Sequence, residues 1–445
     1  MKTDALVLPH EPGWNEARLA WNLAVDQQPA AVALPESPED VAAVVRWARS
    51  RGLRVAPQGT GHNAAAMGSL AHTVLVKTER MRGVTIDPVA RSARVEAGVL
   101  WAEVSEAAAE YGLAALAGSS PDVGVVGYSL GGGISWFARK HGLAANSVTA
   151  IELVNADGEF VRADPENESE LFWALRGGGG SFGVVTALEF ALYPIPEVHA
   201  GVLFFPLERG AEVLRAWRRW IEDVPDEVTS VGRFLQFPPI PDIPEPLRGR
   251  SFVAVQAFYL GSEAEGAALV APIRALEPEI DTVQTIPAAA LQHVHMDPEH
   301  PVPGRGDGML LDDLPAAGID ALVAAAGPGS GSPLLSVEVR QLGGALGRPA
   351  AGGGAVSHLN ADFALFGIGI AMTPEMGTAA AAHVETVREV LAPWEAETTY
   401  LNFAEREVAG DRIFGPYAHH RLRAVKAAYD PADLFRSNQP IAPAR

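Results

Sequence analysis

Cysteine is absent from the 445 residues of this chain. Disulfides, thiolate nucleophiles and cysteine-ligated metals are therefore excluded. We expect no metal site from other ligands either, because the 12 histidines are scattered and the pair His419-His420 has no matching carboxylate cluster. The chain also lacks a run of 18 apolar residues, and it lacks a short apolar leader within residues 1–22. We therefore expect a cytoplasmic protein that does not enter a membrane.

Basic charge is also scarce. Lys and Arg total 34 against 54 Asp and Glu, which gives a formal net charge of −20. Nucleic acids and anionic membranes both require a basic face, so we expect neither as a partner. The same deficit restricts how a phosphate-bearing ligand is held. Backbone N–H groups and helix N-termini, and not a lysine cluster, have to meet its charge.

Glycine is abundant, at 45 of 445 residues. Much of it lies in three loops, at residues 55–64, 118–133 and 177–183. The first loop follows a short predicted strand and places His62 directly after Gly59-Thr60-Gly61. Because glycine has no Cβ, such loops let backbone N–H groups approach an anionic ligand closely. A histidine inside the loop can reach the same ligand.

The periodicity of apolar residues divides the chain into three parts. Residues 30–195 alternate predicted helices and strands around the glycine loops, which indicates an α+β unit. Within this unit, Ser37-Pro38-Glu39-Asp40 predicts the start of a helix, and residues 151–162 predict a hairpin around Asp157-Gly158. Residues 200–400 predict an antiparallel sheet with helices over one face. We place the domain boundaries at 1–197, 198–397 and 398–445, the last being a segment that returns to the first domain. The elements expected in the second and third parts are strands 251–260, 334–342, 363–372 and 400–403 and helices 209–221, 263–276, 378–391 and 416–429.

Three ligand classes compete for the glycine loops. A dinucleotide fingerprint of the Rossmann type needs a third glycine at an offset that Gly59-Thr60-Gly61 lacks. A phosphate-binding P-loop needs Gly-Lys-Ser/Thr, which is absent. The third class is a flavin cradle built from several separate loops, with His62 against the isoalloxazine ring. For the first loop alone, an ordinary turn with an incidental histidine is the alternative.

Four segments, in this order along the chain, resemble the FAD-linked oxidase superfamily typified by vanillyl-alcohol oxidase, and more closely its berberine-bridge-enzyme-like branch. They are residues 57–62, 118–133, 171–186 and 429–435, the last together with Asn438. The resemblance covers roughly residues 30–195 and 395–445. It implies an α+β fold that combines a two-part FAD-binding domain of the PCMH type with a substrate domain, whose mixed or antiparallel sheet is covered by helices.

The resemblance also implies that FAD is bound covalently, through His62 and the flavin 8α-methyl carbon. Such a link raises the reduction potential of the flavin and prevents its loss. The sequence does not distinguish which imidazole nitrogen is used, and His62 could instead only hydrogen-bond the flavin. Many members have a second link through a cysteine, but Ser120 stands there in this chain, so at most one link forms. The residues expected around FAD are Pro57, Gln58, Gly59, Thr60, Gly61, His62, Asn63, Gly68, Gly118, Ser120, Asp122, Val123, Gly124, Gly127, Tyr128, Gly131, Gly132, Gly133, Gly142, Leu143, Val184, Val185, Tyr400, Asn402 and Asn438.

The reaction that the resemblance implies is oxidation of a carbon bearing oxygen or nitrogen in a small organic molecule. Hydride leaves to flavin N5, a base removes the O–H or N–H proton, and dioxygen reoxidises the flavin. Tyr400 and Asn402 are the first candidates, because the resemblance places them beside the flavin ring, although Tyr400 could simply pack there. Many relatives use a second tyrosine as the base; Phe403 stands at that position here.

Two residues of strand 334–342 complete the catalytic candidates. Glu338 shares one strand face with Arg340, so the two could instead form an ion pair between strands. Gln341 lies on the opposite face, where it could line the pocket. The acidic chain and the moderately apolar second domain favour a neutral or cationic, partly aromatic substrate of secondary metabolism.

Two other functions fit the same residues. The flavin could pass its electrons to another carrier, as in a dehydrogenase, or act as an oxygenase. Alternatively, the chain could bind flavin without catalysis, because Phe403 and Leu359 replace a tyrosine and an arginine that are common in the branch. Flavin reoxidation in air and bleaching by alcohols or amines separate these hypotheses.

Overall fold

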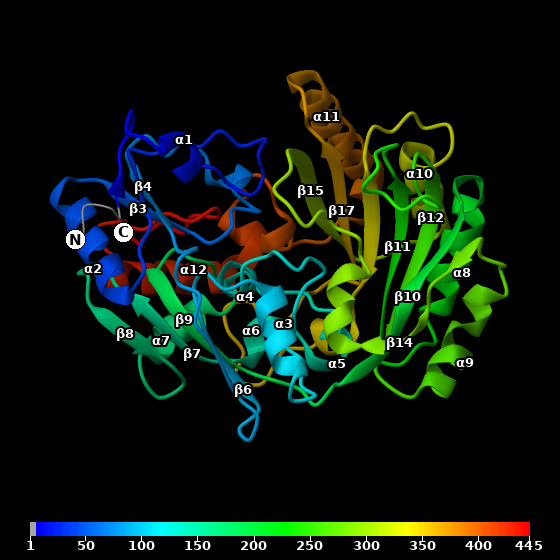
Figure 1. The fold of residues 1–445 in the computed structure, drawn as a ribbon, viewed down its shortest axis with the longest axis horizontal. Helices are drawn as coiled ribbons and strands as arrows, with labels where there is room; N and C mark the ends of the chain where they lie inside the picture. The colour runs from blue at the N-terminus through cyan, green and yellow to red at the C-terminus, as the bar shows by residue number, and fades with distance from the viewer. Residues whose placement is uncertain (1–5) are drawn as a thin grey trace.

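The computed structural model describes residues 6–445. Residues 1–5, which belong to the first predicted domain and to the N-terminal segment considered above, lie outside the described range. The chain forms two halves that lie side by side (Figure 1). One half contains residues 6–195 and the C-terminal tail, and the other contains the long sheet and its helices.

The N-terminal half begins with a small four-stranded sheet. Its order is β1–β2–β4–β3, and β2, β4 and β3 run parallel. The helix that covers this sheet, α2 (Pro38–Ser50), begins as the sequence predicts, because the Ser37 hydroxyl accepts a hydrogen bond from the Asp40 amide at 3.2 Å. The sheet strands and the short elements beside them are β1 (Leu6–Val7), α1 (Trp14–Ala17), β2 (Ala31–Ala33), β3 (Arg54–Gln58), the 3₁₀ turn η2 (Ala65–Met67) and β4 (Thr73–Lys77).

A second, five-stranded sheet completes this half. Its order is β5–β6–β9–β7–β8, and all its pairings are antiparallel. The hairpin predicted around Asp157-Gly158 is confirmed as β7 and β8. The elements are β5 (Val84–Asp87), β6 (Ser92–Glu96), α3 (Trp101–Ala109), α4 (Val125–Leu130), α5 (Ala138–His141), α6 (Ala144–Ser147), β7 (Val148–Val154), β8 (Phe160–Ala163), α7 (Ser169–Leu175) and β9 (Val184–Ala191).

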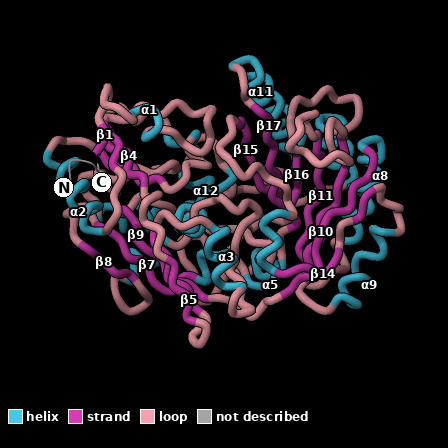
Figure 2. The backbone as a smooth tube through the Cα atoms, viewed as in Figure 1, coloured by secondary structure: helices cyan, strands magenta, loops and turns pink. Residues whose placement is uncertain are grey.

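The other half is one antiparallel sheet of order β13–β10–β12–β11–β16–β17–β15, with β14 also paired to β10. Its strands form the fan on the right of Figure 2. Apolar side chains of α8, α9, α10 and α11 cover one face, as predicted, and the other face packs against the N-terminal half. The elements are β10 (Glu197–Pro206), η3 (Leu207–Arg209), α8 (Gly210–Trp220), β11 (Val228–Gln236), β12 (Ser251–Tyr259), α9 (Glu263–Arg274), β13 (Ile280–Asp281), β14 (Gln284–Pro287), η4 (Ala288–His293), β15 (Gly304–Leu311), α10 (Ala316–Ala326), β16 (Ser336–Gln341), η5 (Gly344–Gly347), β17 (Phe363–Ile370), α11 (Pro374–Leu391) and η6 (Ala392–Trp394).

The tail returns to the N-terminal half. The strand expected at residues 400–403 is wrong, because the segment forms a 3₁₀ turn, η7 (Leu401–Phe403), between the two halves. The helix α12 (Gly410–Tyr429) is interrupted at Gly415, whose φ of 71° is left-handed, and the predicted helix 416–429 is the part after this break.

A buried ion pair organises the chain after α12. Lys426 and Asp430 are both fully buried, and Lys426 Nζ donates to Asp430 Oδ2 at 2.6 Å. The ammonium also donates to the carbonyls of Ser181, at 2.6 Å, and Phe435, at 3.0 Å. The Asp430 carboxylate accepts the amides of Leu434 and Phe435, each at 2.8 Å. The pair therefore folds the tail and fixes it to the third glycine loop.

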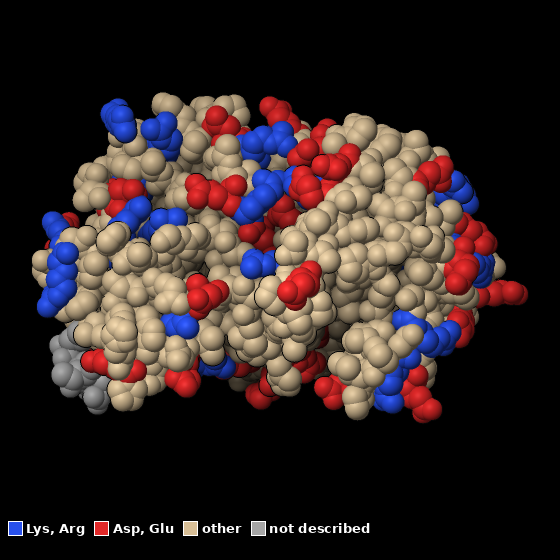
Figure 3. Space-filling view, turned by 90° about the horizontal axis from the view of Figure 1, so that it is seen from above, with Lys and Arg blue, Asp and Glu red and all other residues tan. Residues whose placement is uncertain are grey.

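Within residues 6–445, no helix combines the length and the apolar character needed to cross a membrane. On the face shown in Figure 3, basic and acidic side chains are interspersed.

We predict that Lys426→Met destabilises the protein by about 3 kcal/mol, because it leaves the buried Asp430 carboxylate without its counter-ion. The midpoint of urea unfolding, followed by tryptophan fluorescence, measures the loss. Lys140→Met is the matched control. It removes an ammonium whose pair with Glu227 is exposed, with 41% of the Lys140 side chain accessible, and should cost less than about 1 kcal/mol. Equal shifts for the two variants would contradict this account of the tail.

Candidate active site

The first glycine loop brings His62 against the N-terminal segment. Gly61 has a left-handed φ of 89°, and a Cβ there would lie 2.9 Å from the Cβ of Ala20. The imidazole of His62 stacks on the indole of Trp21, with ring centroids 4.0 Å apart and an interplanar angle of 18°. The Trp21 amide donates to the Thr60 carbonyl at 2.9 Å. Backbone and ring contacts thus hold the loop in one conformation.

Each ring nitrogen of His62 faces a different group. Nδ1 lies 2.7 Å from the Thr60 hydroxyl. Nε2 makes no hydrogen bond, although it lies 3.3 Å from Asp122 Oδ1. The Asp122 carboxylate accepts from the Ser120 hydroxyl at 2.9 Å and from the indole N–H of Trp21. Burial raises the pKa of Asp122, but its contacts with His62, Trp21 and Ser120 outweigh burial, and the pKa lies below its usual value.

The end of the second glycine loop admits no side chains. A Cβ on Gly131 would lie 1.8 Å from Asn402 Oδ1, and one on Gly133 would lie 2.4 Å from the ring of Tyr128. Gly132 and Gly133 also have left-handed φ values of 111° and 80°. Asn402 occupies the space beside Gly131, and its amide donates to the Tyr128 carbonyl at 3.0 Å.

Tyr400 lies against the same loop. Its phenol oxygen accepts from the amides of Gly133 at 3.0 Å and Ile134 at 3.1 Å, and from the Asn402 side chain at 3.0 Å. Burial raises the pKa of Tyr400 to about 12, against these donors and the nearby Arg340, which lower it. Three N–H donors directed at one phenol oxygen favour the phenolate, so the site combines a high resting pKa with groups ready to stabilise the anion.

A chain of amide side chains connects the tail to the first loop. Asn438 Nδ2 donates to Asn63 Oδ1 at 3.0 Å, and Asn63 Nδ2 donates to the carbonyls of Asn402, at 3.3 Å, and Ala404, at 3.1 Å. The first glycine loop therefore meets the turn at Leu401–Phe403 and the tail, both of which lie more than 300 residues away in sequence. The structure brings His62, Asn63, Ser120, Asp122, Gly131, Gly132, Gly133, Tyr400, Asn402 and Asn438 together through these contacts.

Other residues expected around FAD have packing or turn roles in the structure. The Tyr128 hydroxyl donates to the Leu116 carbonyl at 3.1 Å, and the ring packs edge-on against Trp101. Leu143 packs beside Gly132. Positive φ angles occur at Gly68 and Gly142. Three of the expected residues are buried in strands: Gln58, Val184 and Val185. The other expected residues lie within the first two glycine loops, at Pro57, Gly59, Thr60, Gly61, Gly118, Val123, Gly124 and Gly127.

A cluster of buried charges lies on the face of the large sheet that meets the N-terminal half. Glu338 Oε1 accepts from Arg340 Nε at 2.7 Å, and Oε2 lies 2.8 Å from His295 Nε2. Burial raises the pKa of Glu338, but Arg340, His295 and Arg233 outweigh it and hold the pKa well below its usual range. The pair lies along one strand, β16, and not between strands as considered from the sequence. A carboxylate that nearby positive groups hold in its ionised form is a weak base.

The same cluster reaches the second glycine loop. Arg340 Nη2 donates to the Ser119 hydroxyl at 3.2 Å, and that hydroxyl donates to Asp297 Oδ2 at 3.2 Å. The Arg340 guanidinium lies 5.1 Å from the ring centroids of both Trp136 and Phe403. The two halves of the molecule are therefore joined beside Ser120 by charged and aromatic groups.

Gln341 does not belong to this face, so the expectation that it lines the pocket is wrong. Its amide oxygen accepts from the Ser230 hydroxyl at 3.0 Å, and the amide nitrogen donates to the Ile221 carbonyl. The Trp217 indole of α8 donates to the same hydroxyl. Alternation along β16 sends Gln341 under the covering helices while Arg340 points to the N-terminal half.

Several participants in these contacts were not among the residues proposed from the sequence, among them Trp21, Ser119, Arg233, His295 and Asp297. Trp21 and His295 carry no local signal, because their partners are distant in sequence. In the described range, no group of three or more His, Asp or Glu side chains is arranged to hold a metal ion.

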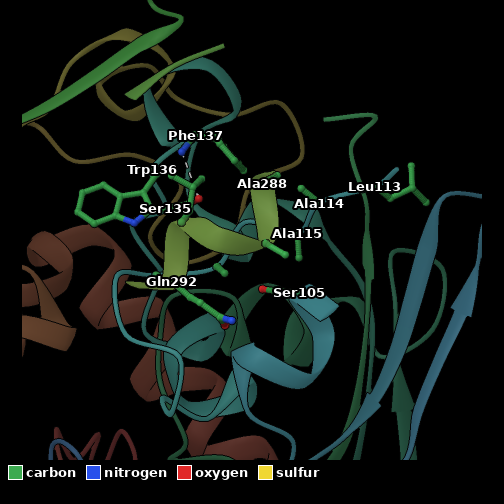
Figure 4. Close-up of a pocket in the computed structure, with 13 residues that line it drawn as sticks. Ser105, Leu113, Ala114, Ala115, Ser135, Trp136, Phe137, Ala288 and Gln292 are labelled. Carbon is green, nitrogen blue, oxygen red and sulfur yellow. Dashed lines mark hydrogen bonds between the residues drawn. The ribbon is translucent and has the colours of Figure 1, made fainter. Parts of the chain in front are cut away.

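The residues at the junction fit a flavin. The ring nitrogens of His62 face the small polar groups of Thr60 and Asp122, which leaves the imidazole able to bond to the cofactor, and a side chain at Gly131 or Gly133 would collide with Asn402 or Tyr128. Two other cavities of the structure do not form the flavin site. One of about 20 Å³, between α3, η4 and Ser135–Phe137, has room for a water molecule (Figure 4). The other, of about 410 Å³, lies along β10, β13 and β14, and neither is lined by His62 or Tyr400.

Comparison with known proteins agrees with this geometry. Residues 29–164 match the family described as FAD binding domain, and residues 399–442 match the family described as berberine and berberine like. The FAD-linked oxidoreductase YgaK of Bacillus subtilis (strain 168) is 26% identical over 100% of this chain and 98% of its own length. The (R)-6-hydroxynicotine oxidase of Paenarthrobacter nicotinovorans is 34% identical over 43% of this chain and 42% of its own.

The fold is shared with solved structures. That of Physcomitrella patens BBE-like 1 superposes with a TM-score of 0.85 over 99% of this chain and 97% of the other, at 22% identity. The fold and the site therefore define a FAD-linked oxidoreductase of the vanillyl-alcohol oxidase and PCMH type. Within that class, the match over residues 399–442 and the shared fold make the chain similar to the berberine-bridge-enzyme-like branch.

We predict that Gly131→Ala displaces Asn402, whose oxygen lies where the new Cβ must stand. The expected cost is about 1–3 kcal/mol of stability, as for other overpacked sites, together with a lower flavin-to-protein ratio. Thermal unfolding and visible absorbance measure both. The matched control is Gly347→Ala, which lies outside the three glycine loops and where a Cβ meets nothing within 4 Å. A Gly131→Ala protein as stable and as yellow as the control would contradict the close approach described here.

Proposed function

We propose that this protein is an oxidase whose FAD is bonded to His62 by a single covalent link, and that it oxidises a C–O or C–N carbon of a small organic molecule with dioxygen as the electron acceptor. The observation that carries the proposal is the meeting of His62, the second glycine loop and Tyr400–Asn402 at one junction. Residues 29–164 and 399–442, which match the FAD-binding and berberine-like families, contain all of these groups. Ser120, bonded to Asp122, offers no second link.

Bound FAD supplies hydride acceptance at N5 and reoxidation by dioxygen. The chain supplies position and proton transfer. Asn402 and the amides of Gly133 and Ile134 fix the phenol oxygen of Tyr400 in one place. The His62 loop and the Gly131–Gly133 loop meet through Asn63 and Asn402, so a ring held at His62 is presented to Tyr400.

We assign proton acceptance to Tyr400. The three N–H donors and the positive Arg340 stabilise Tyr400 as a phenolate, and the phenolate oxygen can then accept the substrate proton and become neutral. Glu338, the other candidate, serves instead to hold Arg340. Its carboxylate is already engaged by Arg340 and His295, and so it has little tendency to take a proton.

The aromatic side chains at the junction favour a partly aromatic substrate, and the net charge of −20 favours one that is neutral or cationic. Trp136 and Phe403 flank the guanidinium of Arg340, and Phe403 packs on Phe366 with centroids 4.9 Å apart. One relative is named (R)-6-hydroxynicotine oxidase, which is consistent with an aromatic nitrogen compound. Flat aromatic rings bind such surfaces by stacking and by burial of apolar area.

The covalent link is tested by acid precipitation of the purified protein. We expect the yellow colour to remain in the pellet for the natural chain and to appear in the supernatant, or not at all, for His62→Ala. His72→Ala, a change at a surface histidine, is the control and should keep its pellet colour. Covalent flavin in His62→Ala protein would disprove the assignment to this residue.

The role of Tyr400 is tested by the pH dependence of flavin reduction under anaerobic conditions. Because the pKa of Tyr400 is about 12, its phenolate fraction, and with it the reduction rate, should rise about tenfold per pH unit between pH 7 and 9. Tyr400→Phe should lose this dependence and about 10²–10⁴-fold in rate while it retains flavin. Tyr128→Phe, which removes another buried phenol, should keep both the dependence and the rate.

A profile without pH dependence in the natural chain would contradict proton acceptance by Tyr400. If no alcohol or amine bleaches the flavin of the natural chain, the result favours a flavin-binding protein without catalysis. Slow reoxidation in air favours a dehydrogenase.

A further inference from the structure

The surroundings of His62 fix how its ring is protonated. Asp122 presents a carboxylate oxygen 3.3 Å from Nε2. An ionised carboxylate accepts hydrogen bonds and donates none, so the imidazole proton is favoured on Nε2. At the other nitrogen, the Thr60 hydroxyl lies 2.7 Å from Nδ1 and is able to donate to it. Both neighbours therefore favour the same tautomer, with a proton on Nε2 and a lone pair on Nδ1.

The carboxylate itself is held in place by two further donors. The Ser120 hydroxyl donates to Oδ1 at 2.9 Å, and the Trp21 indole N–H donates to Oδ2. Only 15% of the Asp122 side chain is exposed. Trp21 also covers one face of the His62 ring at 4.0 Å, so it fixes the imidazole and the carboxylate relative to each other.

We propose that Asp122 is the positioning residue for covalent attachment of the flavin, and that it directs the link to Nδ1 of His62. The inference rests on the proposed function, since it needs a flavin bonded to His62. Asp122 acts through the histidine: it keeps Nδ1 unprotonated, and it stabilises the positive charge that the ring acquires when Nδ1 forms a new bond.

His62 Nδ1 forms a C–N bond to the 8α carbon, a C–H bond of the methyl group breaks, and its proton leaves to solvent. Two electrons remain on the isoalloxazine ring, and dioxygen removes them together with two protons as hydrogen peroxide. The imidazole carries the positive charge on the side of Nε2 until that proton is lost, and the Asp122 carboxylate faces this side.

The residues that flank this arrangement explain why a carboxylate is useful at position 122. The chain offers Ser120 where many relatives have a second flavin link, and the Ser120 hydroxyl is turned toward Asp122. With a single tether, the reactivity and orientation of His62 determine how much of the protein becomes covalently loaded.

The experiment uses protein expressed without flavin, or freed of unbound flavin, and then supplied with FAD in air. Acid-stable absorbance and the intact mass of the chain are followed with time, and FAD affinity is measured separately by fluorescence quenching. For Asp122→Asn we expect the linking rate to fall at least about tenfold, as for other histidines that lose an orienting carboxylate. FAD affinity before linking should change little, because asparagine has nearly the shape of aspartate: its amide oxygen accepts from the Trp21 indole, and its amide group can donate to the Ser120 hydroxyl.

Two further variants separate positioning from a structural effect. Asp122→Glu keeps the carboxylate and should recover part of the linking rate. Thr60→Val removes the hydroxyl beside Nδ1 but leaves Asp122 in place, so it should link faster than Asp122→Asn. Fragmentation of the flavin peptide should place the flavin on Nδ1 in the natural chain.

The outcomes distinguish the two proposals. If the natural chain itself gains no acid-stable flavin, covalent attachment at His62 fails, and the role of Asp122 fails with it. If the natural chain links normally and Asp122→Asn links at the same rate, or if the flavin lies on Nε2, only the role of Asp122 is overturned. Equal loss of FAD affinity and linking in Asp122→Asn would show a structural role instead.

Discussion

The ion pair between Lys426 and Asp430 is the contact on which the closed site depends. Both side chains are fully buried, and between them they bond the tail to itself and to the third glycine loop through the Ser181 carbonyl. The folded tail then pairs with β3, since the Val55 amide donates to the Leu434 carbonyl at 2.8 Å and the Arg436 amide donates to the Val55 carbonyl at 2.9 Å. β3 leads directly into the loop of His62. A charge buried in the C-terminal helix thus fixes the strand from which the expected flavin ligand projects.

Close packing against Asn402 and Tyr128 fixes the second glycine loop, as the ion pair fixes the tail. Gly131 leaves room for Asn402, and Asn402 in turn bonds the Tyr400 phenol and the Tyr128 carbonyl. Because the site is assembled from loops of one half, a turn between the halves and the tail, no single segment is sufficient to form it. Backbone groups and amides make most of these contacts. This agrees with a chain whose net charge of −20 leaves few cations for a phosphate-bearing cofactor.

Local rules in the sequence were enough for much of this architecture. The Ser37 cap, the hairpin at Asp157-Gly158 and the sheet with helices on one face follow from capping, turn chemistry and periodicity, and all three are confirmed. Alternation along the strand placed Gln341 and Arg340 on opposite faces, but it could not predict which of the two faces the helices cover. The turn at Leu401–Phe403 and the contacts of Trp21 and His295 depend on partners hundreds of residues away or in another element. Local patterns carry no information about such pairings.

The claim at the centre of this account is that His62 carries the flavin in a site closed by the tail. The most direct test is mass spectrometry of a tryptic digest of the purified yellow protein. Cleavage after Arg54 and Lys77 releases residues 55–77, which contain His62 and no other segment of the site. The account predicts that this peptide carries the added mass of the flavin. A flavin on any other peptide, or on none, would contradict it.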